Sequence, residues 1–289
     1  MTTRCVEERK QIEVVGYTAA EMGCILRKLP PQTHKDAELT LMFLKQNLSW
    51  MASPEKNARD RVTNFLNRFN WNMDEEVRSA ASNDCPLSKQ IVGSVDVFPV
   101  MCPQDAEHTR YTGKYKGACL KFELWVTNDG VPFAVYGPYA GAMHDSNVLS
   151  TGEKFLHTPH EFFLADKAYI GQPHLIVPRK ISKNNPYTDD EKVFVLHHRK
   201  HRAQVEHAIG RLHRFRIMWY SAHRPDFTEA AVKFIVWCEH TVGSMRYVGV
   251  PRVIRRGLDG HDVCRCAFVS DSKRKAAVRR RAREPEEEE

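Results

Sequence analysis

Apolar residues in the first 85 positions recur at helical spacing and predict short helices. Two stretches carry the pattern, AELTLMFLKQNLSWM at 37–51 and NARDRVTNFLNRFNW at 57–71. Between them, Ser53-Pro54-Glu55 is typical of a helix start, with Ser53 as cap and Pro54 in the first turn. Two short helices and a turn fit either a DNA-binding helix-turn-helix or a packing subdomain, and the second helix has no clear basic face.

The pattern changes to strand character between residues 90 and 140. The segment IVGSVDVFPV at 91–100 is β-branched and mostly apolar, and ACLKFELWVTNDG at 118–130 alternates between apolar and polar residues. Its last three residues form a hairpin turn signal, after which VPFAVYGPY at 131–139 predicts the partner strand. Short turns between successive strands indicate an antiparallel unit.

The second half of the chain mixes helices with short strands. DSNVLSTGEKFL at 145–156 predicts a short helix, EFFLADKAYI at 161–170 a buried strand, and HLIVPRK at 174–180 another short strand. A long helix is predicted at 199–216 and a further apolar helix at 227–248. One face of the first of these helices carries Val205, Ala208, Ile209, Leu212 and Phe215. This order predicts an α/β fold, a mixed sheet flanked by helices with a small N-terminal helical region.

Charge is distributed unevenly along the chain. Residues 192–283 hold 21 Lys/Arg against 7 Asp/Glu, a net charge of +14, whereas residues 1–191 hold 22 against 24, a net charge of −2. This asymmetry points to nucleic acid or another anionic surface, and the alternative is a merely solvated basic face. Apolar periodicity fades after residue 250, where KRKAAVRRRAR and then EPEEEE predict a disordered tail.

The cysteine and hydropathy patterns indicate the cellular compartment in which we expect the protein. The eight cysteines are scattered without a C-x-x-C pair, so we expect free thiols in a reducing compartment rather than a zinc site. No apolar run approaches the roughly 18 residues that a membrane helix needs. The start MTTRCVEERK has no secretory apolar region. We therefore expect a soluble intracellular protein.

Three carboxylates stand out as candidates for metal binding. Asp96 lies within or at the end of one apolar strand, Asp166 follows the run FFLA, and Glu206 is the only acid between His197 and Arg216. Two strand-end carboxylates and one helical carboxylate can hold divalent metal against a phosphodiester backbone. The ordinary alternatives are turn capping by each aspartate.

Glu206 has its own alternative, an i,i+4 ion pair with Arg202. Asp145 fits either a helix N-cap or an accessory role, and His144 is equally open. Lys167 suits a pair with Asp166 or a phosphate contact.

Five motifs in order resemble the DDE superfamily endonuclease domain of PIF/Harbinger-type transposases, over residues 90–245. They are VDVFPV, YTGKYKGACLKFELWV, GPYAGAMHDSNVL, FFLADKAYIG and HRAQVEHAIGRLHRFRI. The resemblance implies an RNase H-like core in which Asp96, Asp166 and Glu206 bind two Mg²⁺ or Mn²⁺ ions, with Asp145 accessory. The chain departs from the family pattern at Val97-Phe98, where a Thr-containing pair is common, and at Ala168, where Gly is common.

We therefore predict a metal-dependent DNA endonuclease that cuts phosphodiester bonds by a two-metal, three-carboxylate mechanism. The alternative is a catalytically inactive, domesticated DNA- or chromatin-binding protein. The predicted divisions are a helical region at 1–85, the nuclease domain at 86–248 and the tail at 249–289. Expected partners are DNA, a Myb-like accessory protein and a second copy in a homodimer, in the nucleus. The basic residues expected to contact DNA are Lys114, Arg202, Arg211, Arg214 and Arg216, with Lys167 accessory.

Overall fold

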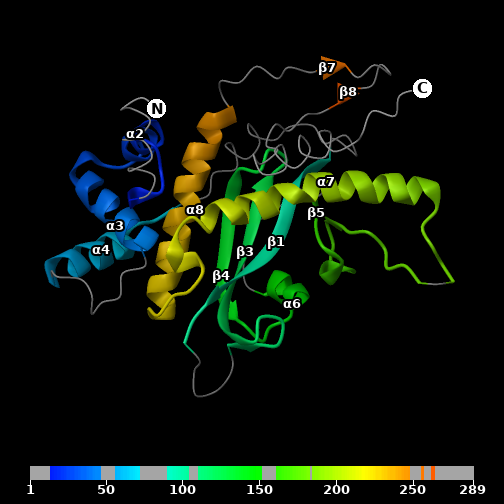
Figure 1. Cartoon of the computed structure of the whole chain (residues 1–289), viewed down its shortest axis with the longest axis horizontal. Coiled ribbons are helices and arrows are strands. Elements are labelled where there is room, and N and C mark those ends of the chain that lie inside the picture. The colour runs from blue at the N-terminus through cyan, green and yellow to red at the C-terminus, as the bar shows by residue number, and fades with distance from the viewer. Residues whose placement is uncertain are drawn as a thin grey trace, which may run out of the picture. The chain divides into compact units, whose positions relative to one another are not determined.

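A six-stranded mixed sheet forms the centre of the fold (Figure 1). In the computed structural model the described residues are 14–46, 56–71, 90–103, 110–151, 161–182, 184–247, 255–256 and 262–263. The strands are β1 (Ile91–Met101), β2 (Tyr111–Thr112), β3 (Gly117–Thr127), β4 (Pro132–Ala140), β5 (Phe162–Leu164) and β6 (Leu175–Ile176). Strands β1, β3 and β4 form the antiparallel meander predicted from the alternating pattern, and β5 and β6 extend it in parallel. The predicted α/β class is confirmed, and the arrangement is consistent with an RNase H-like fold.

Both faces of the sheet are buried, and the β1–β3 register shows which residues lie on which face. Asp96 lies opposite Leu124, which joins Phe98 and Val100 in the hydrophobic cluster shared with the long helices. The neighbouring positions Val95 and Trp125 point to the second cluster, on the other face. Asp96 therefore shares its face of the sheet with the long helices.

Helices cover both faces of the sheet. The long helices α7 (Asp189–Leu212) and α8 (Pro225–Tyr247) pack on one face, and α6 (Asp145–Ser150) with the short 3-10 helix η2 (Lys167–Tyr169) covers the other. In Figure 1, α7 crosses the strands and extends beyond the edge of the sheet. Asp96 on β1 consequently faces α7.

The N-terminal helices share a core with the sheet. They are α2 (Ala19–Arg27), η1 (Pro31–Thr33), α3 (His34–Gln46) and α4 (Lys56–Arg68). Leu41 and Leu66 are buried in the same cluster as Phe234 of α8, close to the short helix η3 (Arg216–Met218). This packing is that of a supporting layer. The predicted helix start at 53–55 lies outside the described residues.

The chain divides into two units, residues 1–248 and 249–289. In the second unit, β7 (Arg255–Arg256) pairs with β8 (Asp262–Val263), and the basic run at 273–283 and the acidic end lie outside the described residues. The described cysteines Cys24, Cys102, Cys119 and Cys238 are buried thiols that form no disulfide. Among the described residues, no helix combines the length and the apolar character that crossing a membrane requires.

Two predicted helices have different bounds in the structure. The helix expected at 145–156 is described only to Ser150, and 152–160 lie outside the described residues. The helix expected at 199–216 begins at Asp189 and ends at Leu212. Thr188 caps it, with its hydroxyl accepting from the Glu191 N–H while the Glu191 carboxylate accepts from the Thr188 N–H.

Candidate active site

Asp96 occupies a half-buried position on β1 facing α7. One carboxylate oxygen accepts a hydrogen bond from the Val97 N–H at 2.8 Å, and the other lies 3.2 Å from Nη1 of Arg202. Burial raises the pKa of Asp96 to about 6, the Arg202 charge offsets part of this, and the carboxylates of Asp166 and Glu206 raise it further. Three segments distant in sequence therefore act on one another electrostatically here.

Glu206 lies on α7, one turn beyond Arg202. The Arg202 guanidinium also pairs with the Glu206 carboxylate, which is 52% exposed, so the i,i+4 ion pair expected from the spacing is present. The same guanidinium binds Asp96, 106 residues earlier in the chain. Arg202 thus joins the first and third predicted acids.

Asp166 follows β5 and caps the short helix η2. Its side chain accepts from the Lys167 N–H, so the turn-capping role weighed from the sequence is present. The residue is exposed, and its charge acts on Asp96. The Asp166 carboxylate therefore both caps η2 and acts electrostatically on Asp96. The Lys167 ammonium lies over the Tyr187 ring, 5.8 Å from its centroid.

Three oxygen-donor carboxylates make up a ligand set that suits Mg²⁺ or Mn²⁺ by its chemistry. Within the described part of the chain, however, no three acidic, histidine or cysteine side chains converge closely enough to hold an ion. Arg202 instead supplies the positive charge between Asp96 and Glu206. Carboxylates are the type of ligand that these metals prefer. For an ion to bind here, Asp96 and Glu206 must give up their ion pairs with Arg202.

Asp145 is held by a lysine that sequence reasoning missed. Asp145 is the first residue of α6. The cap of this helix is His144, whose Nδ1 accepts a hydrogen bond from the Ser146 N–H. The Asp145 carboxylate lies 2.9 Å from Nζ of Lys121, a buried residue of β3. The N-cap alternative for Asp145 is therefore wrong. A lysine in the middle of the mostly apolar strand ACLKFELWV was the available signal.

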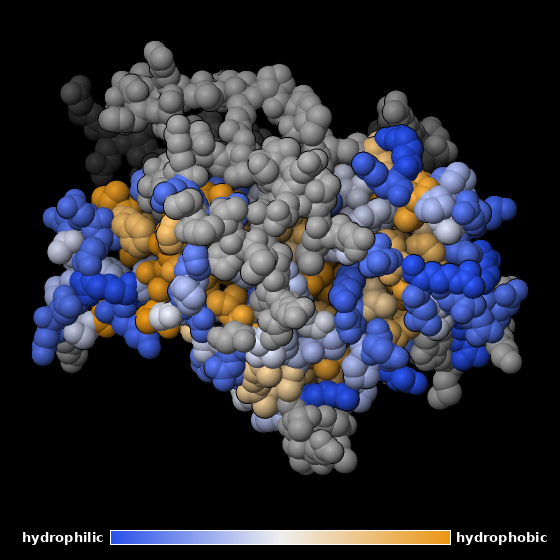
Figure 2. Space-filling model, turned by 180° about the vertical axis from the view of Figure 1, so that it is seen from behind, coloured by the Kyte–Doolittle hydropathy of each residue, from blue (hydrophilic) through white to orange (hydrophobic). Residues whose placement is uncertain are grey.

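The predicted DNA-contacting arginines separate into two groups. Arg211 and Arg214 both pair with Glu239 of α8, whose side chain is only 1% exposed. Arg216 is exposed and has no side-chain partner among the described residues. Arg211 and Arg214 thus join α7 to α8, and their DNA contact stays a prediction. In the coloured part of Figure 2, which views the molecule from behind, hydrophilic residues lie at both sides with hydrophobic residues between them.

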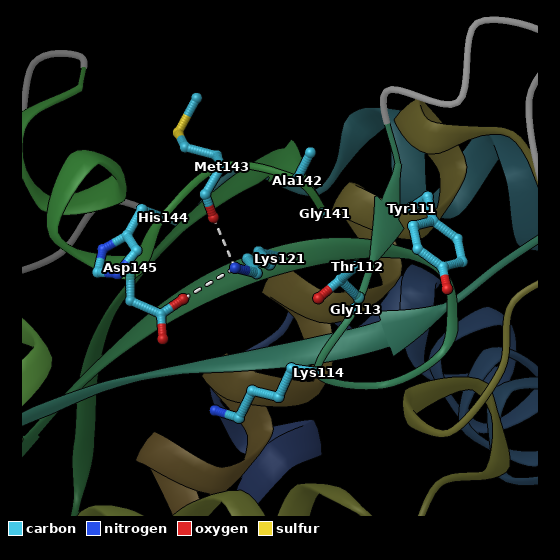
Figure 3. A pocket seen from close by; sticks show the side chains of 10 residues that line it. All are labelled: Tyr111, Thr112, Gly113, Lys114, Lys121, Gly141, Ala142, Met143, His144 and Asp145. Atoms are coloured by element: carbon cyan, nitrogen blue, oxygen red, sulfur yellow. Dashed lines mark hydrogen bonds and ion pairs between the residues drawn. The ribbon is translucent and has the colours of Figure 1, made fainter.

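A polar cleft of about 400 Å³ lies where the β2–β3 loop meets the segment between β4 and α6 (Figure 3). Lys114 is exposed on the loop side. Burial lowers its pKa, but Tyr115, Asp145 and Asp96 together raise the pKa above its usual value. The cleft lining is Tyr111, Thr112, Gly113, Lys114, Lys121, Gly141, Ala142, Met143, His144 and Asp145. Lys114 therefore connects this cleft electrostatically to Asp96.

Comparison with known families supports the interpretation of the motifs. Residues 96–238 match the family model described as DDE superfamily endonuclease, a span that contains Asp96, Asp166 and Glu206. The match supports a transposase-like nuclease, a hydrolase with a DNA substrate, at the level of the superfamily. No curated protein and no solved structure matches the chain.

Proposed function

We propose, on the premise that residues 96–238 are a DDE superfamily endonuclease domain, that this protein is a PIF/Harbinger-type, divalent-metal-dependent DNA endonuclease. The observation that supports the proposal is the electrostatic effect of Asp166 and Glu206 on Asp96. The three acids come from a strand, a strand end and a helix, and both other carboxylates act on the pKa of Asp96. A carboxylate with a raised pKa that is influenced by acids on other elements is typical of catalytic sites.

Asp96, Asp166 and Glu206 would hold two Mg²⁺ or Mn²⁺ ions. Bound divalent ions supply Lewis-acid activation of water and stabilise the leaving oxygen of a phosphodiester. Asp96 contributes as a carboxylate after losing its proton. Arg202, once released from the acids, is positioned to bind a phosphate, and Arg216 and Lys114 add charge along the backbone. Asp145 keeps an accessory role by holding Lys121 in place.

The proposal extends to partners and location. DNA is the substrate, a Myb-like protein supplies sequence recognition, two copies act together on two DNA ends, and the nucleus is the compartment. The second candidate is an inactive, domesticated DNA- or chromatin-binding protein. It is favoured by one observation, the ion pairing of both Asp96 and Glu206 with Arg202.

Plasmid cleavage distinguishes the two candidates. The purified protein is incubated with supercoiled plasmid in Mg²⁺, in Mn²⁺ and in EDTA, beside the Glu206→Gln variant. The nuclease proposal predicts nicking that needs metal and disappears in Glu206→Gln. Salt-sensitive DNA binding with no nicking in any metal supports the inactive protein instead.

Cleavage is expected to decline at acid pH with a midpoint set by Asp96. The pKa of Asp96 is raised to about 6, so below this pH the group is protonated and cannot bind metal. At subsaturating Mn²⁺ the rate should fall about tenfold for each pH unit below the midpoint and level off above it. The measurement is the nicking rate between pH 5 and 8, and a rate that is flat across this range contradicts the assignment of Asp96.

A further inference from the structure

The cleft beside the β2–β3 loop has a buried cation in its lining. Lys121 is 7% exposed, and its ammonium donates to the Met143 carbonyl at 2.6 Å and to the Asp145 carboxylate at 2.9 Å. An ammonium has three N–H groups, and these are the two acceptors it has within the described residues. One donor is left for an acceptor in the cleft. Because both partners fix the Lys121 side chain, this donor has a set position.

An exposed aromatic ring stands across from that cation. Tyr111 is 44% exposed and lines the cleft, and Figure 3 shows it on the side opposite His144 and Asp145, with Lys121 between. Between Tyr111 and Lys114 lies Gly113, where an added Cβ would meet no atom within 4 Å. The cleft thus combines an aromatic surface, an anchored donor and open space, features that suit a flat, polar ligand.

Lys114 indicates that the ligand carries a negative charge. This exposed ammonium lines the cleft, and the carboxylates of Asp145 and Asp96 both act on it. A phosphate bound by Lys114 therefore lies near the candidate catalytic carboxylates, and an adjoining base lies near Tyr111. One nucleotide supplies both groups.

We propose that this cleft binds a single unpaired nucleotide of a DNA strand. Its base stacks on Tyr111, a base acceptor receives the free Lys121 N–H, and its phosphate binds Lys114. The nucleotide is unpaired because a base inside a duplex has both faces covered by its neighbours, whereas stacking on a side chain needs an exposed face. This inference rests on the proposed function, since it makes the cleft the place where substrate DNA is locally opened beside the carboxylates.

The test is equilibrium DNA binding measured by fluorescence anisotropy in EDTA, so that no cleavage occurs. Two probes share one sequence, a fully paired duplex and the same duplex with one central unpaired thymidine. The wild-type protein should bind the probe with the unpaired thymidine about tenfold more tightly, in line with the energy of one base–aromatic stack. Tyr111→Ala should remove that preference and leave binding to the paired duplex within about twofold.

Three further variants make the test specific. Tyr115→Ala removes an exposed ring of the β2–β3 loop that does not line the cleft, and it should keep the preference. Gly113→Leu should fill the cleft and abolish the preference without removing any charge. Lys114→Gln should weaken both probes alike, as loss of a phosphate contact does. Equal binding of the two probes by wild type, or equal losses in Tyr111→Ala and Tyr115→Ala, overturns the proposal.

The result is separable from the nuclease test. Metal-dependent nicking without any preference for the unpaired thymidine would remove the cleft proposal and leave the nuclease standing. A Tyr111-dependent preference in a protein that never cuts DNA would support the cleft and remove the nuclease.

Discussion

Asp166→Asn is expected to lower the DNA cleavage rate by about 10³-fold or more, since a metal ligand contributes several kcal/mol to the transition state. Asparagine caps helices about as well as aspartate, so the bond from the Lys167 N–H to the side chain is retained and η2 keeps its start. The substitution therefore removes the negative charge and spares the fold. DNA affinity should stay within about threefold, because loss of one acid removes no phosphate contact.

The matched control for this prediction is Asp190→Asn. Asp190 is also exposed and also lies in the first turn of a helix, α7, but away from the three carboxylates. The Asp190→Asn protein should cleave DNA at the wild-type rate. Rates are compared by single-turnover nicking in Mn²⁺. Wild-type cleavage by Asp166→Asn would remove that residue from the site.

Replacing Arg211 and Arg214 together by Met is expected to destabilise the protein by about 3–5 kcal/mol. The double variant leaves the Glu239 carboxylate, which is 1% exposed, without its two cations. An unpaired buried charge is costly, whereas an apolar replacement of the whole cluster is often neutral. The triple variant that adds Glu239→Met should therefore recover most of the loss. Urea unfolding of the three proteins measures both effects.

The triple variant also tests the DNA contact expected from the sequence for these arginines. If they serve only to join α7 and α8, the triple variant binds DNA within about threefold of wild type and keeps its salt dependence. A stable triple variant whose salt dependence is weaker by about two phosphate contacts would instead assign both arginines to DNA. An unstable triple variant contradicts the structural role, because it means that the ion pairs were not the source of the loss.

The sheet was predictable because its signals are local. Alternation in β3 and the Asn128-Asp129-Gly130 turn place the meander without knowledge of any distant contact. The beginning of α7 was missed because apolar periodicity reports burial. Val193 and Leu196, near the beginning of α7, are exposed, 56% and 67%. The Thr188–Glu191 capping pair was the signal for that start.

The candidate acids and the Arg202–Glu206 pair could be proposed from the sequence, but the other partners of these acids could not. Asp96 and Asp166 each follow an apolar run, a pattern visible in sequence, whereas the contact from Arg202 to Asp96 depends on how α7 lies on β1. The pairing of Arg214 with Glu239 depends likewise on α7 against α8. Basic residues on a helix therefore predict a charge, and tertiary packing decides whether that charge meets DNA or a buried carboxylate.

The most direct test of the central claim is Mn²⁺ binding at pH 7.5, followed by the loss of the free-ion electron paramagnetic resonance signal. Wild-type protein and the Asp96→Asn, Asp166→Asn and Glu206→Gln variants are titrated in parallel, each with the uncleaved paired duplex present. If the three carboxylates form one metal centre, the wild-type protein binds two ions saturably and each variant weakens binding by about tenfold or more. Saturable binding that is unchanged in all three variants, or no saturable binding by wild type, contradicts the claim.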